Sequence, residues 1–146
     1  MKRIALLALV AILGFSALSA RDLYSRDASA LPQAARMIIS KYCKADVSLV
    51  KTDKELGRVK DYEVVLTDGT EIKFDRDGNW EDIETAMKKS VPTAIVPEGV
   101  ANYVKKYHKG QRIIGIERDR SGYDVELSSG LDLKFNKAGE FQRYDD

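Results

Sequence analysis

The chain has few of the residues from which catalytic and metal sites are usually built. Its 146 residues include one cysteine, Cys43, and one histidine, His108. A single cysteine excludes an internal disulfide and is expected to pack in the core, and a lone histidine without a cysteine cluster provides no zinc site. No Gly-x-Ser-x-Gly elbow is present to supply a nucleophile. The sequence therefore predicts a protein that is not an enzyme, with no cofactor and no metal site assigned.

The chain also lacks an excess of charge of either sign. Lysine and arginine number 24 against 23 aspartate and glutamate residues, a formal net charge of +1. Because the two signs are mixed along the sequence, they leave no electrostatic footprint for nucleic acid or for an anionic membrane. We therefore expect no nucleic acid partner.

A long apolar run occurs only at the start, in residues 1–20. Lys2 and Arg3 precede an apolar stretch at residues 4–15, and small residues follow at 17–20. This is the pattern of an export signal, and the run is shorter than the roughly 20 residues of a membrane span. We expect cleavage after Ser19 or Ala20, leaving a soluble periplasmic or secreted protein with no membrane span. Residues 21–30 are expected to form a flexible lead-in.

The sequence does contain a long internal repeat. Residues 62–80, YEVVLTDGTEIKFDRDGNW, return as YDVELSSGLDLKFNKAGEF at residues 123–141, with seven of the 19 positions identical. Such a repeat indicates one supersecondary unit used twice. Each copy follows an apolar residue and a proline that begin a helical stripe. The stripes are Leu31, Ala35, Ile38, Ile39, Tyr42 and Val96, Val100, Tyr103, Val104, Tyr107.

The turn spacing fixes the geometry of each copy. A three-residue loop ending in left-handed Gly69 pairs Val64 with Ile72 and Tyr62 with Phe74. The same loop shape ending in Gly78 places Phe74 opposite Trp80. The resulting aromatic face, expected to be buried beneath the helices, consists of Tyr62, Phe74, Trp80, Tyr123, Phe135 and Phe141.

Together these patterns predict an α+β fold of two tandem repeats, each a helix plus four antiparallel strands. The repeats cover residues 31–83 and 96–146, joined by a connector at 84–95 into one compact domain. The first strand of each repeat is expected at 47–53 and 113–119, and a charged loop is expected at 54–58. Both helices should lie on one face of the sheet. The pattern leaves open whether the strands make one sheet or two.

The opposite face of the meanders is charged. The pairing places Glu63 opposite Lys73, and Lys73 opposite Glu81; in the second copy Asp124 faces Lys134, which faces Gln142. Two features depart from a simple solvated face: an exposed valine, and the like charges of Glu126 and Asp132 opposite each other. We interpret this face as a partner-binding surface. Its candidate residues are Glu63, Val65, Glu71, Lys73, Asp124, Glu126, Asp132 and Lys134.

The turn at Asp75, Asp77 and Asn79 offers an alternative, because oxygen side chains alternate there as at the start of a calcium loop. An EF-hand loop needs glycine at its sixth position and glutamate at its twelfth, and this turn has glycine fourth and Ala86 twelfth. A hairpin turn explains the same residues. A third function, small-molecule carriage, would need a pocket between helices and sheet, and the filled aromatic rows argue against such space.

The proline-started helix, the motif YEVxLxDGxxIxFDxxGxW and the connector VPxxIxP resemble the PepSY-like, beta-lactamase-inhibitor-like family of exported bacterial proteins. The resemblance covers nearly all of the chain after residue 30. It implies an α+β fold of helix-plus-four-strand units and a role in binding or inhibiting another exported protein. The predicted function is an exported, non-enzymatic binding module, an inhibitor or sensor of an unidentified envelope protein. The alternative is a calcium-binding periplasmic structural or regulatory protein that uses the Asp75-Asp77-Asn79 turn.

Overall fold

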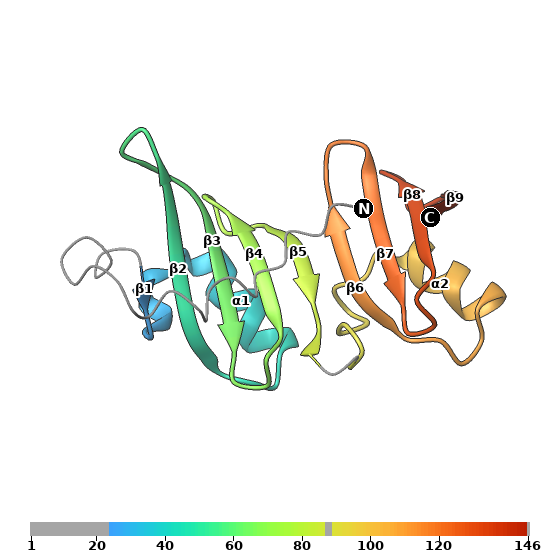
Figure 1. Cartoon of the computed structure of the whole chain (residues 1–146), viewed down its shortest axis with the longest axis horizontal. Coiled ribbons are helices and arrows are strands. Elements are labelled where there is room, and N and C mark those ends of the chain that lie inside the picture. The colour runs from blue at the N-terminus through green and yellow to red at the C-terminus, as the bar shows by residue number, and fades with distance from the viewer. Residues whose placement is uncertain (1–23, 87–88, 146) are drawn as a thin grey trace.

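The described part of the chain folds into one antiparallel sheet with two α-helices (Figure 1). The computed structural model describes residues 24–86 and 89–145, so the expected export signal at 1–20 lies outside the described residues. The helices are α1 (Gln33–Tyr42) and α2 (Glu98–Tyr107), preceded by a 3-10 turn, η2 (Ala28–Ala30). The strands are β1 (Tyr24–Ser25), β2 (Val47–Glu55), β3 (Arg58–Leu66), β4 (Glu71–Asp75), β5 (Trp80–Glu84), β6 (Ile113–Arg118), β7 (Gly122–Leu127), β8 (Asp132–Asn136) and β9 (Phe141–Asp145).

Every strand pairs with its neighbours in the sequence, in the order β1 to β9. The question of one sheet or two is therefore answered: β5 pairs with β6 and joins the two parts into a nine-stranded sheet. The ninth strand is β1, which pairs with β2 where the sequence carried no strand pattern.

Both helices cover the same face of this sheet, as Figure 1 shows. The buried residues of α1 are Ala35 and Ile39, and those of α2 are Val100 and Val104. All four belong to one core cluster with Phe74 and Phe135 of the sheet. The α+β class and the side on which the helices lie are as predicted. We call the other face, which no helix of the described residues covers, the open face.

The aromatic row forms the floor beneath the helices. Phe74 and Phe135 are fully buried and Trp80 is 8% exposed. Tyr62, Tyr123 and Phe141 are partly buried and pack against the same core. Tyr103 of α2 stacks on Phe141 with ring centroids 4.4 Å apart. The row therefore lies on the core side of the sheet, as predicted.

The predicted pairings are correct between β3 and β4. Between β4 and β5, Phe74 lies opposite Trp80 as predicted, but the next pair differs. Lys73 lies opposite Asp82 rather than Glu81, because Glu81 is an extra residue in β5. The same bulge in β9 places Lys134 opposite Arg143 rather than Gln142. A bulge shifts the alternation by one residue. It lets both Trp80 and Ile83 (1% exposed) point towards the helices.

The prediction of a charged loop at residues 54–58 is wrong. Strands β2 and β3 continue through this segment and form a long hairpin that projects beyond its neighbours in Figure 1. Its tip is Leu56 (φ 51°) and Gly57 (φ 76°), both left-handed, as a tight two-residue hairpin turn requires. Polar residues suggested a loop, but a hairpin arm outside the core can be polar on both faces.

Neither helix in the described part of the chain is long and apolar enough to cross a membrane.

Candidate functional site

The open face carries two cross-strand rows of charged side chains. The strand register puts them opposite one another from strand to strand. The first, which we call the paired row, consists of Lys51, Glu63, Lys73, Asp82, Glu117, Asp124, Lys134 and Arg143. The second, the acidic row, consists of Glu71, Glu84, Gly115, Glu126, Asp132 and Asp145.

Lysines and carboxylates make close ion pairs in and beside the paired row. The ammonium of Lys134 lies 3.2 Å from Asp124, as predicted. Glu63 lies opposite Lys73, as predicted, but its carboxylate bonds the Lys51 ammonium on the other side, at 3.1 Å. The Lys73 ammonium reaches Asp61, at 3.3 Å, and also lies 4.0 Å from Glu81. A residue in a central strand has a neighbour on each side, and the pairing rule considered only one of them.

These ion pairs are more buried than an uncovered sheet face suggests. Asp61 is 4% exposed, and Glu63 and Asp124 are each 8% exposed. The methylene stems of lysines can cover apolar and polar neighbours while the ammonium groups stay near water. The face is therefore an ordered surface rather than a set of freely mobile charges.

The acidic row contains only acidic residues and one glycine. Glu71 lies opposite Glu84, and Asp132 lies between Glu126 and Asp145. Like charges directly opposite each other destabilise a sheet. Burial raises the pKa of Glu71, and the nearby carboxylates of Glu84 and Glu63 raise it further. The row therefore places like charges opposite one another on adjacent strands of the open face.

Acidic side chains also line a depression where β5 meets β6. This shallow depression surrounds Gly115, and its acidic lining residues are Asp82, Glu84, Glu117 and Glu126. Burial raises the pKa of Glu117, with further contributions from Asp124 and Asp119. A basic group from another molecule would be attracted to this depression.

All eight sequence-predicted residues lie on the open face. Glu63, Lys73, Asp124 and Lys134 belong to the paired row; Glu71, Glu126 and Asp132 belong to the acidic row, and Val65 lies beside it, opposite Glu71. Val65 is half-buried rather than exposed. Sequence reasoning missed the acidic residues of β5 and β6, because the bulge in β5 hides their parity and the pairing of β5 with β6 has no local signal.

The Asp75 turn is held by its own hydrogen bonds. Asp75 Oδ1 accepts from the backbone N–H groups of Asp77 and Asn79, both at 2.9 Å, and Oδ2 accepts from the Asn79 amide at 3.0 Å. Burial pushes the pKa of Asp75 up, but these hydrogen bonds outweigh it and lower the pKa. In the second half Asn136 accepts the equivalent bonds from Ala138 and Glu140. Because an uncharged amide accepts the same hydrogen bonds in the second half, the role of the Asp75 carboxylate is explained by closing the turn.

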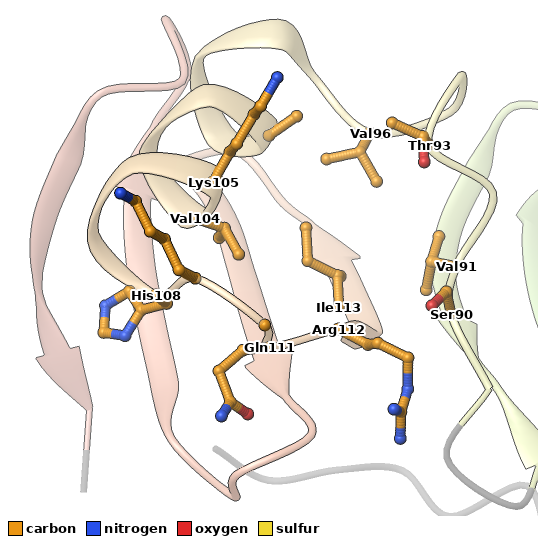
Figure 2. Close-up of a pocket in the computed structure, with 13 residues that line it drawn as sticks. Ser90, Val91, Thr93, Val96, Val104, Lys105, His108, Gln111, Arg112 and Ile113 are labelled. Atoms are coloured by element: carbon orange, nitrogen blue, oxygen red, sulfur yellow. The ribbon is translucent and has the colours of Figure 1, made fainter.

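A hollow of about 450 Å³ opens on the helix side, beside α2 (Figure 2). Its apolar walls are Val91, Val96, Val104 and Ile113, and its basic lining residues are Lys105, His108, Lys109 and Arg112. The expectation that no such space remains is wrong, because the aromatic rows fill the region under the helix but not the edge beside the connector.

Neither the cysteine nor the histidine forms a reactive site. Cys43 is half-buried and packs against the core, and burial, with Asp68 nearby, raises the pKa of its thiol. His108 caps α2, and its Nε2 lies 3.3 Å from the hydroxyl of Tyr144. The surroundings of both side chains are explained by packing and by the end of α2.

Comparison with solved structures finds the same fold in periplasmic proteins of Bacteroides. One, from Bacteroides vulgatus ATCC 8482, is provisionally described as a periplasmic protein of unknown function; it is 35% identical, with 85% of this chain and 98% of that chain covered, at a TM-score of 0.78. Another, from Bacteroides thetaiotaomicron, is provisionally described as calcium-regulated and periplasmic. It is 32% identical, with coverage of 81% and 92% and a TM-score of 0.73.

Comparison with curated proteins finds no match. The model of a family described as beta-lactamase-inhibitor-like and PepSY-like matches residues 60–143, from β3 to β9. No enzyme family is indicated. The chain belongs to the PepSY-like, beta-lactamase-inhibitor-like family.

Proposed function

We propose that this protein is an exported, non-enzymatic binding module that docks through its open face onto another exported protein. The observation that carries the proposal is the acidic row, in which Glu71 lies opposite Glu84 and Glu126 opposite Asp132. Residues that break a local stability rule are expected mainly at functional sites. Membership of an inhibitor-like family and the periplasmic description of its structural relatives support the same function.

The partner that suits this surface presents lysine or arginine side chains. These would enter the depression around Gly115, where four carboxylates converge. The lysines of the paired row lie beside it, so a partner must match a negative stripe flanked by positive charges. Charge complementarity of this kind speeds association and selects among partners more than it adds affinity.

We further propose that the two halves are copies of one αββββ unit, preceded by an export signal at residues 1–20. The repeated bulges support this. An extra residue interrupts the first strand of each half at Ser48 and Ile114, and the last strand at Glu81 and Gln142. The first unit would cover residues 31–83, the connector 84–95 and the second unit 96–146.

The double variant Glu71→Gln/Glu126→Gln tests the docking surface. It removes two charges from the acidic row, so the partner captured from an envelope extract should bind it at least about tenfold more weakly, mainly through slower association at low salt. The fold should stay intact, because Glu71→Gln relieves repulsion from Glu84 and Gln keeps the size and polarity of both side chains; urea denaturation of the double variant checks this. This separates lost binding from lost folding.

The matched control is Glu98→Gln, which removes a carboxylate from α2 on the helix side. It should bind like the unaltered protein. Surface plasmon resonance at two salt concentrations measures both variants against the captured partner. Equal affinity of the double variant and the unaltered protein would overturn the proposal.

The alternative function, a calcium-binding structural or regulatory protein that uses the Asp75-Asp77-Asn79 turn, has support in the description of one relative. The geometry disfavours it, because both oxygens of Asp75 already accept hydrogen bonds within the turn. A cation there would have to displace them.

A further inference from the structure

Three carboxylates converge on the open face near the tip of the β2–β3 hairpin. Asp53 in β2 lies opposite Asp61 in β3, and Glu63 follows two residues later on the same face. One carboxylate oxygen of each lies within 4.8 Å of the others. We call these three residues the carboxylate trio.

Asp61 is the buried member of the trio and is incompletely satisfied. Its side chain is 5% exposed, and its Oδ2 lies 3.3 Å from the Lys73 ammonium. Its Oδ1 is buried and has no hydrogen-bond partner among the described residues. A buried carboxylate oxygen left in this state is costly, and a bound ion or water is one of the few arrangements that would satisfy it.

The strand geometry holds this arrangement in place. Asp53 pairs with Asp61 and Lys54 pairs with Val59, so Lys60 is an extra residue in β3 immediately before Asp61. Bulges re-aim side chains and are common beside functional sites. The bulge therefore presents Asp61 to Asp53 although two aspartates opposite each other repel.

We propose that Asp53, Asp61 and Glu63 bind a divalent metal cation of the oxygen-preferring class, with Ca²⁺ the best fit. All three ligand groups are carboxylates, which suit Ca²⁺, Mg²⁺ and Mn²⁺ rather than the softer transition metals. The strands fix the ligands without an octahedral cage, and this irregular geometry suits Ca²⁺ better than Mg²⁺. Asp61 Oδ1 would gain the partner that it lacks.

Two lysines set the expected strength of this site. The ammonium of Lys51 lies 3.1 Å from Glu63 and 3.8 Å from Asp53, and the ammonium of Lys73 lies beside Asp61. Each must be displaced or must share its carboxylate with the cation. We therefore expect weak binding, with a Kd on the order of 10⁻⁴ to 10⁻³ M, the range of extracellular calcium modules.

The second half of the chain provides a built-in comparison. Asp61 pairs with Asp75, and the equivalent pair there is Gly122 with Asn136, so the buried aspartate is replaced by glycine. Asp124 takes the place of Glu63 and pairs with Lys134. Among the described residues, the trio therefore occurs in the first half and not in the second.

Calorimetric titration of Ca²⁺ into the purified, chelator-treated protein at low salt tests the proposal. We expect one site, and Asp61→Asn should weaken it at least about tenfold because one of three charged ligands is lost. Asp124→Asn is the matched control in the second half, and Asp77→Ala tests the Asp75 turn. Both should bind Ca²⁺ as the unaltered protein does.

A fourth variant distinguishes a cation site from a simple network of ion pairs. Lys51→Met removes the competing ammonium and should tighten Ca²⁺ binding severalfold, an outcome that does not require Asp61→Asn to fold. No binding up to about 10 mM Ca²⁺ in either the unaltered protein or Lys51→Met would overturn the proposal. Loss of binding in Asp77→Ala, with Asp61→Asn unaffected, would move the site to the Asp75 turn.

Discussion

At the scale of single residues, Glu71 shows what the acidic row costs. Burial and the neighbouring carboxylates raise its pKa above the ordinary value of 4.5. The Glu71 carboxyl group therefore binds a proton more tightly in the folded protein than in the unfolded chain. Stability contributed by the protonated form is present below pH 4.5 and is lost as pH rises through the raised pKa, so ionised Glu71 destabilises the fold at neutral pH.

Glu71→Gln should accordingly raise the free energy of unfolding at pH 7, by a few tenths of a kcal/mol, the scale of one repulsive cross-strand pair. The gain should shrink towards pH 4, where Glu71 is protonated in both states. Urea denaturation at the two pH values measures it, with Glu55→Gln at the exposed hairpin tip as control. If the Glu71→Gln variant were less stable than the unaltered protein at pH 7, the Glu71 carboxylate would be favourable where it lies.

At the scale of secondary structure elements, α2 rests directly on the turn between β8 and β9. A Cβ added at Gly99 would lie 2.5 Å from the carbonyl oxygen of Gly139. Glycine within a helix normally costs about 0.5–1 kcal/mol relative to alanine. Here the close approach of two backbones reverses that preference, because alanine would push the helix away from the turn.

Gly99→Ala should therefore lower the free energy of unfolding, by about 1–3 kcal/mol, the usual penalty for an overpacked contact. Asn102→Ala, on the exposed side of the same helix, is the control and should be neutral or slightly stabilising. Thermal unfolding followed by circular dichroism compares the two. If Gly99→Ala were the more stable protein, the helix would have room to move and the contact would not position it.

The hairpins could be predicted from the sequence where a glycine at a fixed loop position determines the strand pairing. Glycines at the fixed loop position are left-handed, Gly69 at φ 84° and Gly130 at φ 89°, and the pairings that follow from them are correct. The bulge at Glu81 could not be predicted, because an extra residue in a strand leaves no mark in composition. Since that bulge sets the parity of β5, the place of Glu84 in the acidic row was also hidden, although the pair of Glu126 and Asp132 was predicted.

The carboxylate trio was missed for a related reason. Asp53 and Asp61 flank a segment whose charges suggested a loop, and their contact exists only because the hairpin continues through it. A pattern read along one strand does not reveal which residue lies opposite. The fold class could therefore be predicted, but the site depends on register between strands.

At the scale of the whole molecule, a nearly neutral chain distributes its charges unevenly. The acidic row gathers carboxylates on the open face beside the mixed charges of the paired row, and basic side chains line the hollow beside α2. The two halves meet along β5 and β6, where three residue pairs are in register. One core cluster nevertheless includes residues of both halves, among them Ile83 and Ile116. This shared core predicts that the halves unfold together.

The contact between Arg118 and Trp80 allows a test of whether the two halves unfold as one cooperative unit. The Arg118 guanidinium in β6 lies 4.6 Å from the ring centre of Trp80 in β5, and its Nη2 donates to the Trp80 carbonyl at 2.5 Å. Because Trp80 is the only tryptophan, its fluorescence reports on the junction, whereas far-UV circular dichroism reports on the whole fold. Coincident urea transitions by the two probes are expected for one cooperative unit.

Arg118→Met should lower the free energy of unfolding by about 2 kcal/mol, since it removes a partly buried cation–π contact and a charged hydrogen bond. Arg120→Met, exposed in the next turn, should change it little. The two probes should still coincide in Arg118→Met, because Ile83 and Ile116 continue to join the cores. A fluorescence transition that precedes the circular dichroism transition would instead mean that the junction opens first, and that the two halves are separate folding units held together mainly by Arg118.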